Sequence, residues 1–189
     1  MIIVGVGAGS GMLTEDGISR IRTARVIYGS GRALDLARGY AAADAKLILI
    51  TDYKALRSLP DDAVVLSTGD PLMAGLGYLP GEVVPGISSM QVAFARLKVP
   101  WTNVAVVNAH GKDHTVAMER AVRDVAAGHV VFIIADPDFS LAALGSALPP
   151  DVRLAVCEDL GYPSERVAEG TAACPPEVRS RLFCVVAGY

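Results

Sequence analysis

Three glycine-containing turns follow predicted strands in the first half of the chain, and each can bring a small ligand close to the backbone. They are Gly5-Val-Gly-Ala-Gly-Ser-Gly11, Thr68-Gly-Asp-Pro71 with Gly75-Leu-Gly77, and Val84-Pro-Gly-Ile-Ser-Ser89. Glycine has no Cβ, so such turns bend sharply and leave room for a ligand. Open α/β sheets bind ligands at the carboxyl ends of their strands, where these turns are expected. Together they predict a pocket of backbone amides and carbonyls with a few hydroxyls and one carboxylate, which suits a zwitterionic nucleoside.

A dinucleotide site is an alternative interpretation of the first turn, and two features disfavour it. A Rossmann site needs an acidic residue at the tip of the second strand, and that tip reads Tyr28-Gly-Ser30. The first helix is expected to begin at a Thr14 cap, beyond the glycines, so no helix N-terminus meets a pyrophosphate. The chain also lacks the G-x-x-x-x-G-K-[ST] and G-x-S-x-G motifs, which disfavours polyphosphate binding and serine hydrolase chemistry.

Each turn also has a purely structural interpretation. The first can simply lead the chain into a helix, Asp70 can cap its own turn, and Ser88 or Ser89 can cap the helix that follows. The repetition of such a turn after three different strands favours a ligand site.

Short apolar, β-branched runs alternate with helical patterns from the first residue, which is typical of an α/β fold. Pro100 biases Val99 away from helix and precedes a new alternation, so it marks a predicted boundary. Residues 1–100 are expected to form one α/β lobe, and residues 101–189 a second lobe that completes a cofactor cleft. Strands are predicted at 1–6, 26–28, 46–50, 63–67, 83–84, 104–107, 130–134, 153–157 and 182–187, and later helices at 32–38, 88–97, 115–127 and 140–148.

Composition excludes several other functions. The net charge is −3 and no cluster of Lys and Arg is long enough for a nucleic-acid interface. No apolar run approaches the roughly 20 residues of a membrane span, and the N-terminus does not resemble a secretory signal, so the protein is expected in the cytoplasm. The three cysteines have no CxxC spacing, and the three histidines have no convincing metal-ligand spacing, so no metal is expected.

The chain resembles the tetrapyrrole methylase family in the order and spacing of several segments. They are Gly5-Val-Gly-Ala-Gly9, Gly69-Asp-Pro71, Pro85-Gly-Ile-Ser-Ser89, Glu158-Asp-Leu-Gly-Tyr-Pro-Ser-Glu-Arg166 and Glu169-Gly-Thr171. Within the family, Pro85-Gly-Ile-Ser-Ser-Met-Gln-Val-Ala-Phe-Ala-Arg-Leu97, Pro100-Trp101 and His110-Gly-Lys112 are similar to the cobalt-precorrin-7 C-5 methyltransferase branch.

The resemblance implies a two-lobed α/β fold with a mostly parallel N-terminal sheet, a mixed C-terminal sheet and a homodimeric assembly. It also implies a site for the methyl donor S-adenosylmethionine. The family's donor contacts fall here on Gly7, Ala8, Gly9, Thr68, Gly69, Asp70, Met73, Ser88, Ser89, Ile134, Ala135 and Leu160.

The predicted reaction is therefore methylation of C-5 of a corrin precursor in cobalamin biosynthesis. Such a tetrapyrrole carries many carboxylates, which makes Arg32, Lys112 and Arg166 candidate substrate contacts, with solvated surface charge as the alternative. Imidazole exchanges protons near neutral pH, so His110 is a candidate proton acceptor, although a structural histidine explains it equally well. The same fold acting at another corrin position or on a diphthamide precursor remains an alternative. A non-catalytic nucleoside- or dinucleotide-binding module is another.

Two departures from the family pattern affect the first lobe. Leu72-Met-Ala74 stands where an aromatic residue is usual, and only Tyr78-Leu-Pro-Gly-Glu-Val-Val84 separates Gly77 from Pro85, where relatives have a helix. This part of the lobe is therefore expected to be reduced. Many relatives also carry a fused methyltransferase that acts at C-15 and decarboxylates. None follows here, so a separate protein is expected to perform that step.

Overall fold

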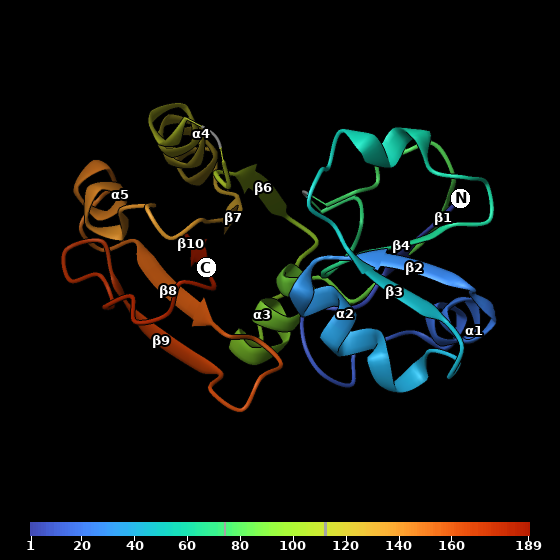
Figure 1. Cartoon of the computed structure of the whole chain (residues 1–189). Coiled ribbons are helices and arrows are strands. Elements are labelled where there is room, and N and C mark those ends of the chain that lie inside the picture. The colour runs from blue at the N-terminus through green and yellow to red at the C-terminus, as the bar shows by residue number, and fades with distance from the viewer. Residues whose placement is uncertain (74, 112) are drawn as a thin grey trace. The chain divides into compact units, whose positions relative to one another are not determined.

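The computed structural model describes residues 1–73, 75–111 and 113–189. The chain divides into two compact units, Met1–Ser89 and Met90–Tyr189 (Figure 1). The division lies earlier than the boundary predicted at residue 100, because helix α3 (Ser89–Leu97) packs with the second unit. The ring of Phe94 in α3 lies 6.3 Å, between centroids, from the ring of Phe132 in strand β7 (Val130–Ile134).

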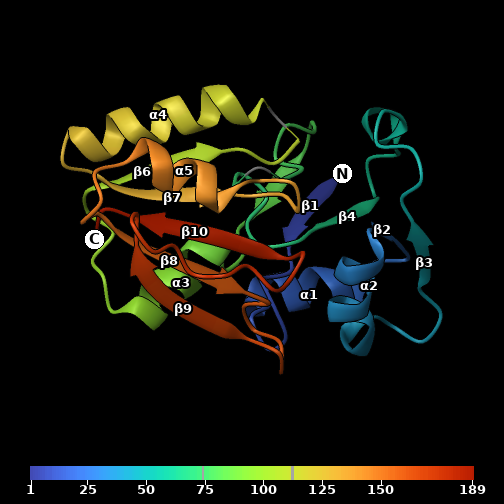
Figure 2. The ribbon, with the colours of Figure 1, turned by 90° about the vertical axis from the view of Figure 1, so that its left-hand side faces the viewer.

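The first unit is built on a parallel sheet with the strand order β3-β2-β4-β1-β5, of which β3, β2, β4 and β1 are labelled in Figure 2. All four strand pairings are parallel, and β1 lies between β4 and β5. The three glycine turns follow β1, β4 and β5, so the topology places them along one edge of the sheet. The strands are β1 (Ile2–Gly5), β2 (Val26–Gly29), β3 (Lys46–Leu49), β4 (Val64–Ser67) and β5 (Glu82–Val84).

Hydroxyl side chains begin both α-helices of this unit. Thr14 accepts a hydrogen bond from the backbone N–H of Gly17 at 3.1 Å and caps α1 (Glu15–Thr23), as predicted. Ser30 likewise accepts from the N–H of Ala33 at 3.3 Å and caps α2 (Gly31–Ala37). The apolar faces of the two helices close a core against the sheet, which includes Val4, Ile21, Ile27, Leu34 and Leu66.

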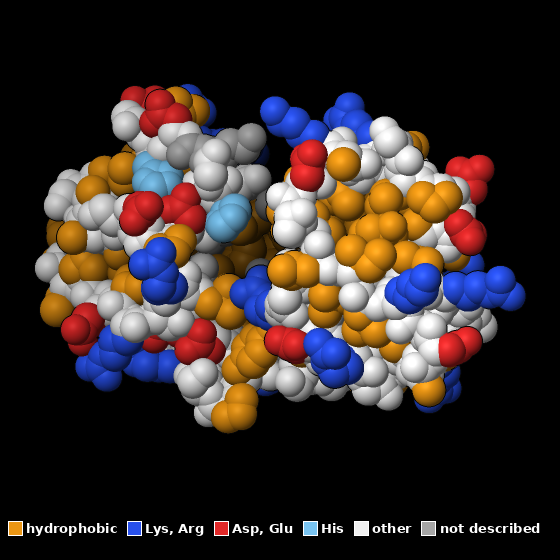
Figure 3. Space-filling view, viewed as in Figure 1, with side chains coloured by type: hydrophobic (Ala, Val, Ile, Leu, Met, Phe, Trp, Pro, Cys, Tyr) orange, Lys and Arg blue, Asp and Glu red, His pale blue; other side chains and the backbone are white. Residues whose placement is uncertain are grey.

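A smaller hydrophobic cluster covers the opposite face of this sheet. Ile3 and Val65 pack with Leu56 of the 3-10 helix η2 (Ala55–Ser58) and with Leu79. A second 3-10 helix, η1 (Arg38–Tyr40), follows α2. Residues 78–84 form a turn and then β5, so the helix that relatives carry here is absent, as predicted. Apolar side chains gather on one face of this unit (Figure 3).

The second unit contains a mixed sheet with the strand order β6-β7-β10-β8-β9. The strands β6 and β7 are parallel and the other pairs are antiparallel, which confirms the predicted pairing of a parallel and a mixed sheet. Strand β9 was not predicted, because its sequence is half-exposed and lies at the sheet edge. The new strands are β6 (Val104–Asn108), β8 (Arg153–Glu158), β9 (Arg166–Thr171) and β10 (Phe183–Ala187).

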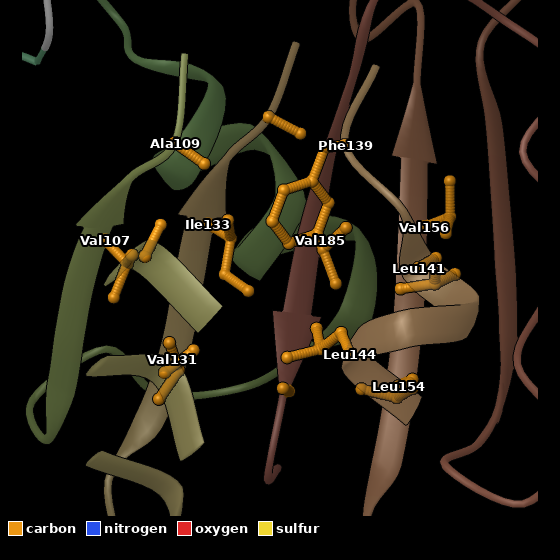
Figure 4. Close-up of a cluster of buried hydrophobic side chains, with 14 of the residues drawn as sticks. Val107, Ala109, Val131, Ile133, Phe139, Leu141, Leu144, Leu154, Val156 and Val185 are labelled. Atoms are coloured by element: carbon orange, nitrogen blue, oxygen red, sulfur yellow. The ribbon is translucent and has the colours of Figure 1, made fainter. Parts of the chain in front are cut away.

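Helices cover both faces of this second sheet. Helices α4 (His114–Ala126) and α5 (Leu141–Ala147) pack on Val131, Ile133 and Val185 (Figure 4). Because neighbouring strand residues point to opposite faces, Phe132 meets α3 on the other side. Within the described residues, no helix is both long enough and apolar enough to cross a membrane.

Candidate active site

The first two glycine turns pair with each other through their backbones. The N–H of Gly7 donates to the carbonyl of Gly69 at 3.2 Å, and the N–H of Gly69 donates to the carbonyl of Gly7 at 2.8 Å. Both residues have a positive φ, +82° for Gly7 and +67° for Gly69, a backbone conformation that residues other than glycine rarely adopt. The turns are thus joined directly beyond the carboxyl ends of β1 and β4.

The third turn packs against the other two with no room for a side chain. A Cβ built on Gly86 would lie 2.3 Å from the carbonyl oxygen of Gly69. A Cβ on Gly5 would lie 2.5 Å from the backbone nitrogen of Gly86. The glycines at these positions are therefore required for the three turns to contact each other backbone to backbone.

Asp70 fixes this arrangement with both carboxylate oxygens. Its Oδ1 accepts the N–H of Leu72 at 2.8 Å, which closes its own turn. Its Oδ2 accepts the N–H of Gly86 at 3.1 Å, which joins the second turn to the third. The structural interpretation of Asp70 as a turn cap is therefore confirmed, and the carboxylate also connects two turns.

The other residues predicted for this unit lie along the same three turns. The N–H of Met73 donates to the carbonyl of Asp70 at 3.1 Å, and Ser88 is buried just before α3. Arg32, in the first turn of α2, donates from Nη2 to Oγ1 of Thr68 at 3.3 Å. One of the three proposed substrate cations is therefore held at the edge of the predicted donor site.

In the second unit, the predicted residue Ile134 ends strand β7, and the predicted residue Ala135 follows it. The carbonyl of Ile134 accepts the N–H of Ala109 at 2.9 Å, which joins the ends of β6 and β7. His110 follows at once, and its backbone N–H donates to Oδ1 of Asn108 at 3.0 Å. Its neighbour Lys112, a predicted substrate contact, lies outside the described residues.

A histidine–aspartate pair, which was not predicted from the sequence, lies at the same sheet edge. Nε2 of His114 is 3.1 Å from Oδ2 of Asp136, and the exposed fractions of the two side chains are 25% and 15%. The N–H of Gly111 also donates to Asp136, and this bond is the main reason why the pKa of the carboxyl is lowered, although burial opposes it. A signal was present, because Asp136 lies two residues beyond a largely buried strand, much as Asp70 lies three residues beyond β4.

Leu160, the last predicted donor contact, is buried in a loop that is held by charged residues. The buried carboxylate of Glu158 accepts hydrogen bonds from Arg166 at 2.6 Å and from the backbone N–H groups of Arg179 and Ser180. Burial raises the pKa of Glu158, but these hydrogen bonds outweigh it, so the net shift is downward. Arg166 is thus bound to a structural partner, which leaves it less available for substrate.

We also searched the described residues for a metal site and for pockets elsewhere. No group of three or more His, Cys, Asp or Glu side chains in this part of the chain is arranged to hold a metal ion. An apolar groove between α4 and α5, lined by Met118, Val122 and Ala143, contains none of the predicted site residues.

Comparison with known proteins identifies relatives that match nearly the whole chain in sequence and in fold. A probable cobalt-precorrin-7 C(5)-methyltransferase of Methanocaldococcus jannaschii is 28% identical over 88% of this chain and 86% of that protein. The crystal structure of a cobalamin biosynthesis precorrin-6Y methylase from Archaeoglobus fulgidus matches with 33% identity and a TM-score of 0.74. That match covers 98% of this chain and 96% of the other.

Two further matches differ in length or in bound ligand. A decarboxylating precorrin-6Y C(5,15)-methyltransferase of Mycobacterium tuberculosis is 30% identical over 93% of this chain, but the match spans about half of that relative, 48%. A uroporphyrin-III C-methyltransferase from Thermus thermophilus, solved with S-adenosyl homocysteine, shares the fold at 18% identity and a TM-score of 0.70. It covers 98% of this chain and 95% of the other. A family model described as Tetrapyrrole (Corrin/Porphyrin) Methylases matches residues 1–175. The chain therefore belongs to the tetrapyrrole methylase family.

Proposed function

We propose that this protein transfers a methyl group from S-adenosylmethionine to C-5 of a corrin precursor of the cobalt-precorrin-7 type, in cobalamin biosynthesis. The observation that carries the proposal is the backbone-to-backbone packing of three glycine turns at the carboxyl edge of a parallel sheet. This edge offers amides and carbonyls rather than a cluster of charges, which suits a zwitterionic nucleoside. The names of the two relatives with 28% and 33% identity support the corrin acceptor.

We assign donor binding to the positions that the family resemblance implies, most of which lie on the three turns of the first unit. Asp70 acts in this site by holding two turns together, since both of its oxygens already accept backbone N–H groups. Its expected contribution to donor binding is thus the shape of the pocket. The donor-binding residues are Gly7, Ala8, Gly9, Thr68, Gly69, Asp70, Met73, Ser88, Ser89, Ile134, Ala135 and Leu160.

The protein's main catalytic task in this proposal is alignment. When bound, S-adenosylmethionine supplies a methyl group that is already activated by the sulfonium, and the meso carbon of a corrin precursor is electron-rich. Rigid turns that hold the donor in one orientation supply much of the rate by removing rotational freedom before the reaction. We assign a substrate carboxylate to Arg32, and the hydrogen bond from its guanidinium to Thr68, a proposed donor contact, supports this assignment.

The assembly in this proposal is a homodimer, as the family resemblance implies. Methylation and decarboxylation at C-15 belong to a separate protein in the same pathway. The Methanocaldococcus relative supports this division, since it is named a C(5)-methyltransferase alone and the match covers 86% of its length.

Calorimetric titration with S-adenosyl homocysteine, with NAD in parallel, tests the donor site. We expect micromolar binding of S-adenosyl homocysteine and none of NAD. Asp70→Ala should weaken that binding about tenfold or more, because two backbone N–H groups lose their acceptor. Asp70→Asn keeps one acceptor oxygen and should weaken it less. Asp62→Ala, at the opposite end of β4, is the matched control and should bind normally.

The same titration distinguishes the alternatives. Binding of NAD alone would refute the proposal in favour of a dinucleotide-binding module. Donor binding without methylation of cobalt-precorrin-7 would retain the methyltransferase site and reject the acceptor. Incubation with labelled donor, followed by NMR assignment of the new methyl carbon, decides the position.

A further inference from the structure

The histidine–aspartate pair of the second unit has the geometry of an oriented proton acceptor. Asp136 is held by three donors: the N–H of Gly111 at 3.0 Å, the N–H of Asp138 at 3.1 Å and Nε2 of His114 at 3.1 Å. A carboxylate held in this way fixes the tautomer of its imidazole partner, so Nε2 carries the hydrogen and Nδ1 presents a lone pair.

The position of the pair is fixed by well-formed secondary structure. His114 begins α4, whose preceding residue Asp113 caps the helix by accepting the N–H of Thr115 at 2.9 Å. The ring of Phe139 meets the imidazole edge-on, with 5.6 Å between the ring centroids. The imidazole is thus restrained by a hydrogen bond on one atom and by an aromatic ring on one side, yet a quarter of its side chain stays exposed.

The pair also lies where ligands of α/β sheets bind. Asp136 follows β7, and the residues before it, Ile134 and Ala135, are among the proposed donor contacts. Parallel pairing of β6 with β7 brings their carboxyl ends together at this edge. Figure 3 shows histidine and carboxylate side chains close together on the face of the second unit.

We infer that His114, oriented by Asp136, is the general base that removes a proton from the corrin acceptor after methylation, an inference that rests on the proposed function. As the new C–C bond forms from an acceptor electron pair, the C–S electron pair goes to sulfur and the acceptor is left one positive charge richer. Nδ1 of His114 takes the proton, the C–H electron pair returns to the conjugated system, and the imidazolium is stabilised by Asp136. This assigns the task to a different histidine from His110, the candidate that the sequence suggested.

The test compares three variants in single-turnover methylation of cobalt-precorrin-7. His114→Gln keeps an N–H that can donate to Asp136 but no longer accepts a proton at neutral pH. We expect it to bind S-adenosyl homocysteine like the wild type, to melt at the same temperature, and to react about 100-fold more slowly. His129→Gln is the matched control, since His129 lies at the other end of β7 and bonds Asn103, and it should react at the normal rate.

Asp136→Asn supplies a readout that a purely structural role would not change. Asparagine removes the anion that stabilises the imidazolium formed in the reaction, so the single-turnover rate should fall about tenfold or more while the affinity for S-adenosyl homocysteine and the melting temperature stay those of the wild type.

Three results would overturn the inference. One is a normal rate in His114→Gln, and another is a rate that falls only in proportion to lost donor binding or lost stability. The third is a normal rate in Asp136→Asn. A wild-type protein that binds no S-adenosyl homocysteine would instead reject the proposed function, and the assigned base with it. The donor titration and the rate measurements therefore separate the two failures.

Discussion

Replacing Gly86 by alanine should disrupt the packing of the three glycine turns. An ideal Cβ at this position lies 2.3 Å from the carbonyl oxygen of Gly69 and 2.8 Å from the carbonyl carbon of Gly5, whereas ordinary contacts begin near 3.4 Å. Both obstacles are backbone atoms, which cannot rotate away as a side chain can. The third turn must therefore move by about 1 Å relative to the other two.

The energetic cost follows from that displacement. Overpacking of this kind costs about 1–3 kcal/mol. The same movement stretches the hydrogen bond from the N–H of Gly86 to Asp70, which adds about 1 kcal/mol. A loss of about 3 kcal/mol in the free energy of unfolding corresponds to a melting temperature lower by roughly 10 °C. The affinity for S-adenosyl homocysteine should fall as well, because the displaced turn is part of the proposed donor site.

Calorimetry on Gly86→Ala and on Gly39→Ala measures both effects. A Cβ on Gly39 meets nothing within 4 Å, so this control adds the same methyl group without a clash. It should melt at or slightly above the wild-type temperature and bind normally, since alanine also restricts the unfolded chain. Equal stability and equal affinity in the two variants would refute the conclusion that the three turns need backbone contact.

Three further outcomes are expected from the second unit. Arg166→Ala should lower the free energy of unfolding by about 3 kcal/mol, because it leaves the buried carboxylate of Glu158 without its cation. Arg179→Ala removes an exposed side chain and should change the free energy little. Equal denaturant midpoints for the two variants would contradict this prediction. Folding lowers the pKa of Glu158, so the contribution of this carboxylate to the free energy of unfolding is complete above the ordinary value of 4.5 and is lost as the pH falls through the lower folded value. Glu158→Gln should flatten this part of the stability–pH curve. An unchanged curve would refute the assignment. Cys174 is exposed while the other two cysteines are buried, so one thiol should react with a thiol-specific reagent in the native protein and three should react after denaturation. Fast reaction of all three thiols in native buffer would contradict the burial of the other two.

The alternation of strands and helices was predictable because most strands here are buried on at least one face. Strand β4 is buried at all four positions and apolar at the first three, so it is recognisable without any partner, and its observed bounds differ from the prediction by one residue. Strand β9 contains Arg166, Glu169 and Gly170 and is half-exposed, so its sequence resembles a loop. It becomes a strand by pairing with β8 at the sheet edge, and that pairing is not visible in local periodicity.

The histidine–aspartate pair was missed for a related reason. His114 and Asp136 are 22 residues apart and lie on different elements, so no local spacing connects them. They meet because α4 returns the chain to β7, which then ends beside β6. The sequence suggested His110 as the candidate proton acceptor, whereas the structure gives the imidazole of His114 a carboxylate partner. Contacts of this kind depend on how the elements pack.

A comparison of Asp70 with Asp136 shows what sequence position alone does not determine about a carboxylate after a strand. In both, Oδ1 accepts the N–H of the residue two positions on, and Oδ2 accepts a glycine N–H from another turn, Gly86 or Gly111. The same device thus closes a turn and joins it to a neighbour in each unit. Only Asp136 also bonds a titratable side chain, His114. The residue type and its place at the strand end predict the structural role, whereas the additional partner distinguishes a carboxylate that shapes a pocket from one that can orient a base.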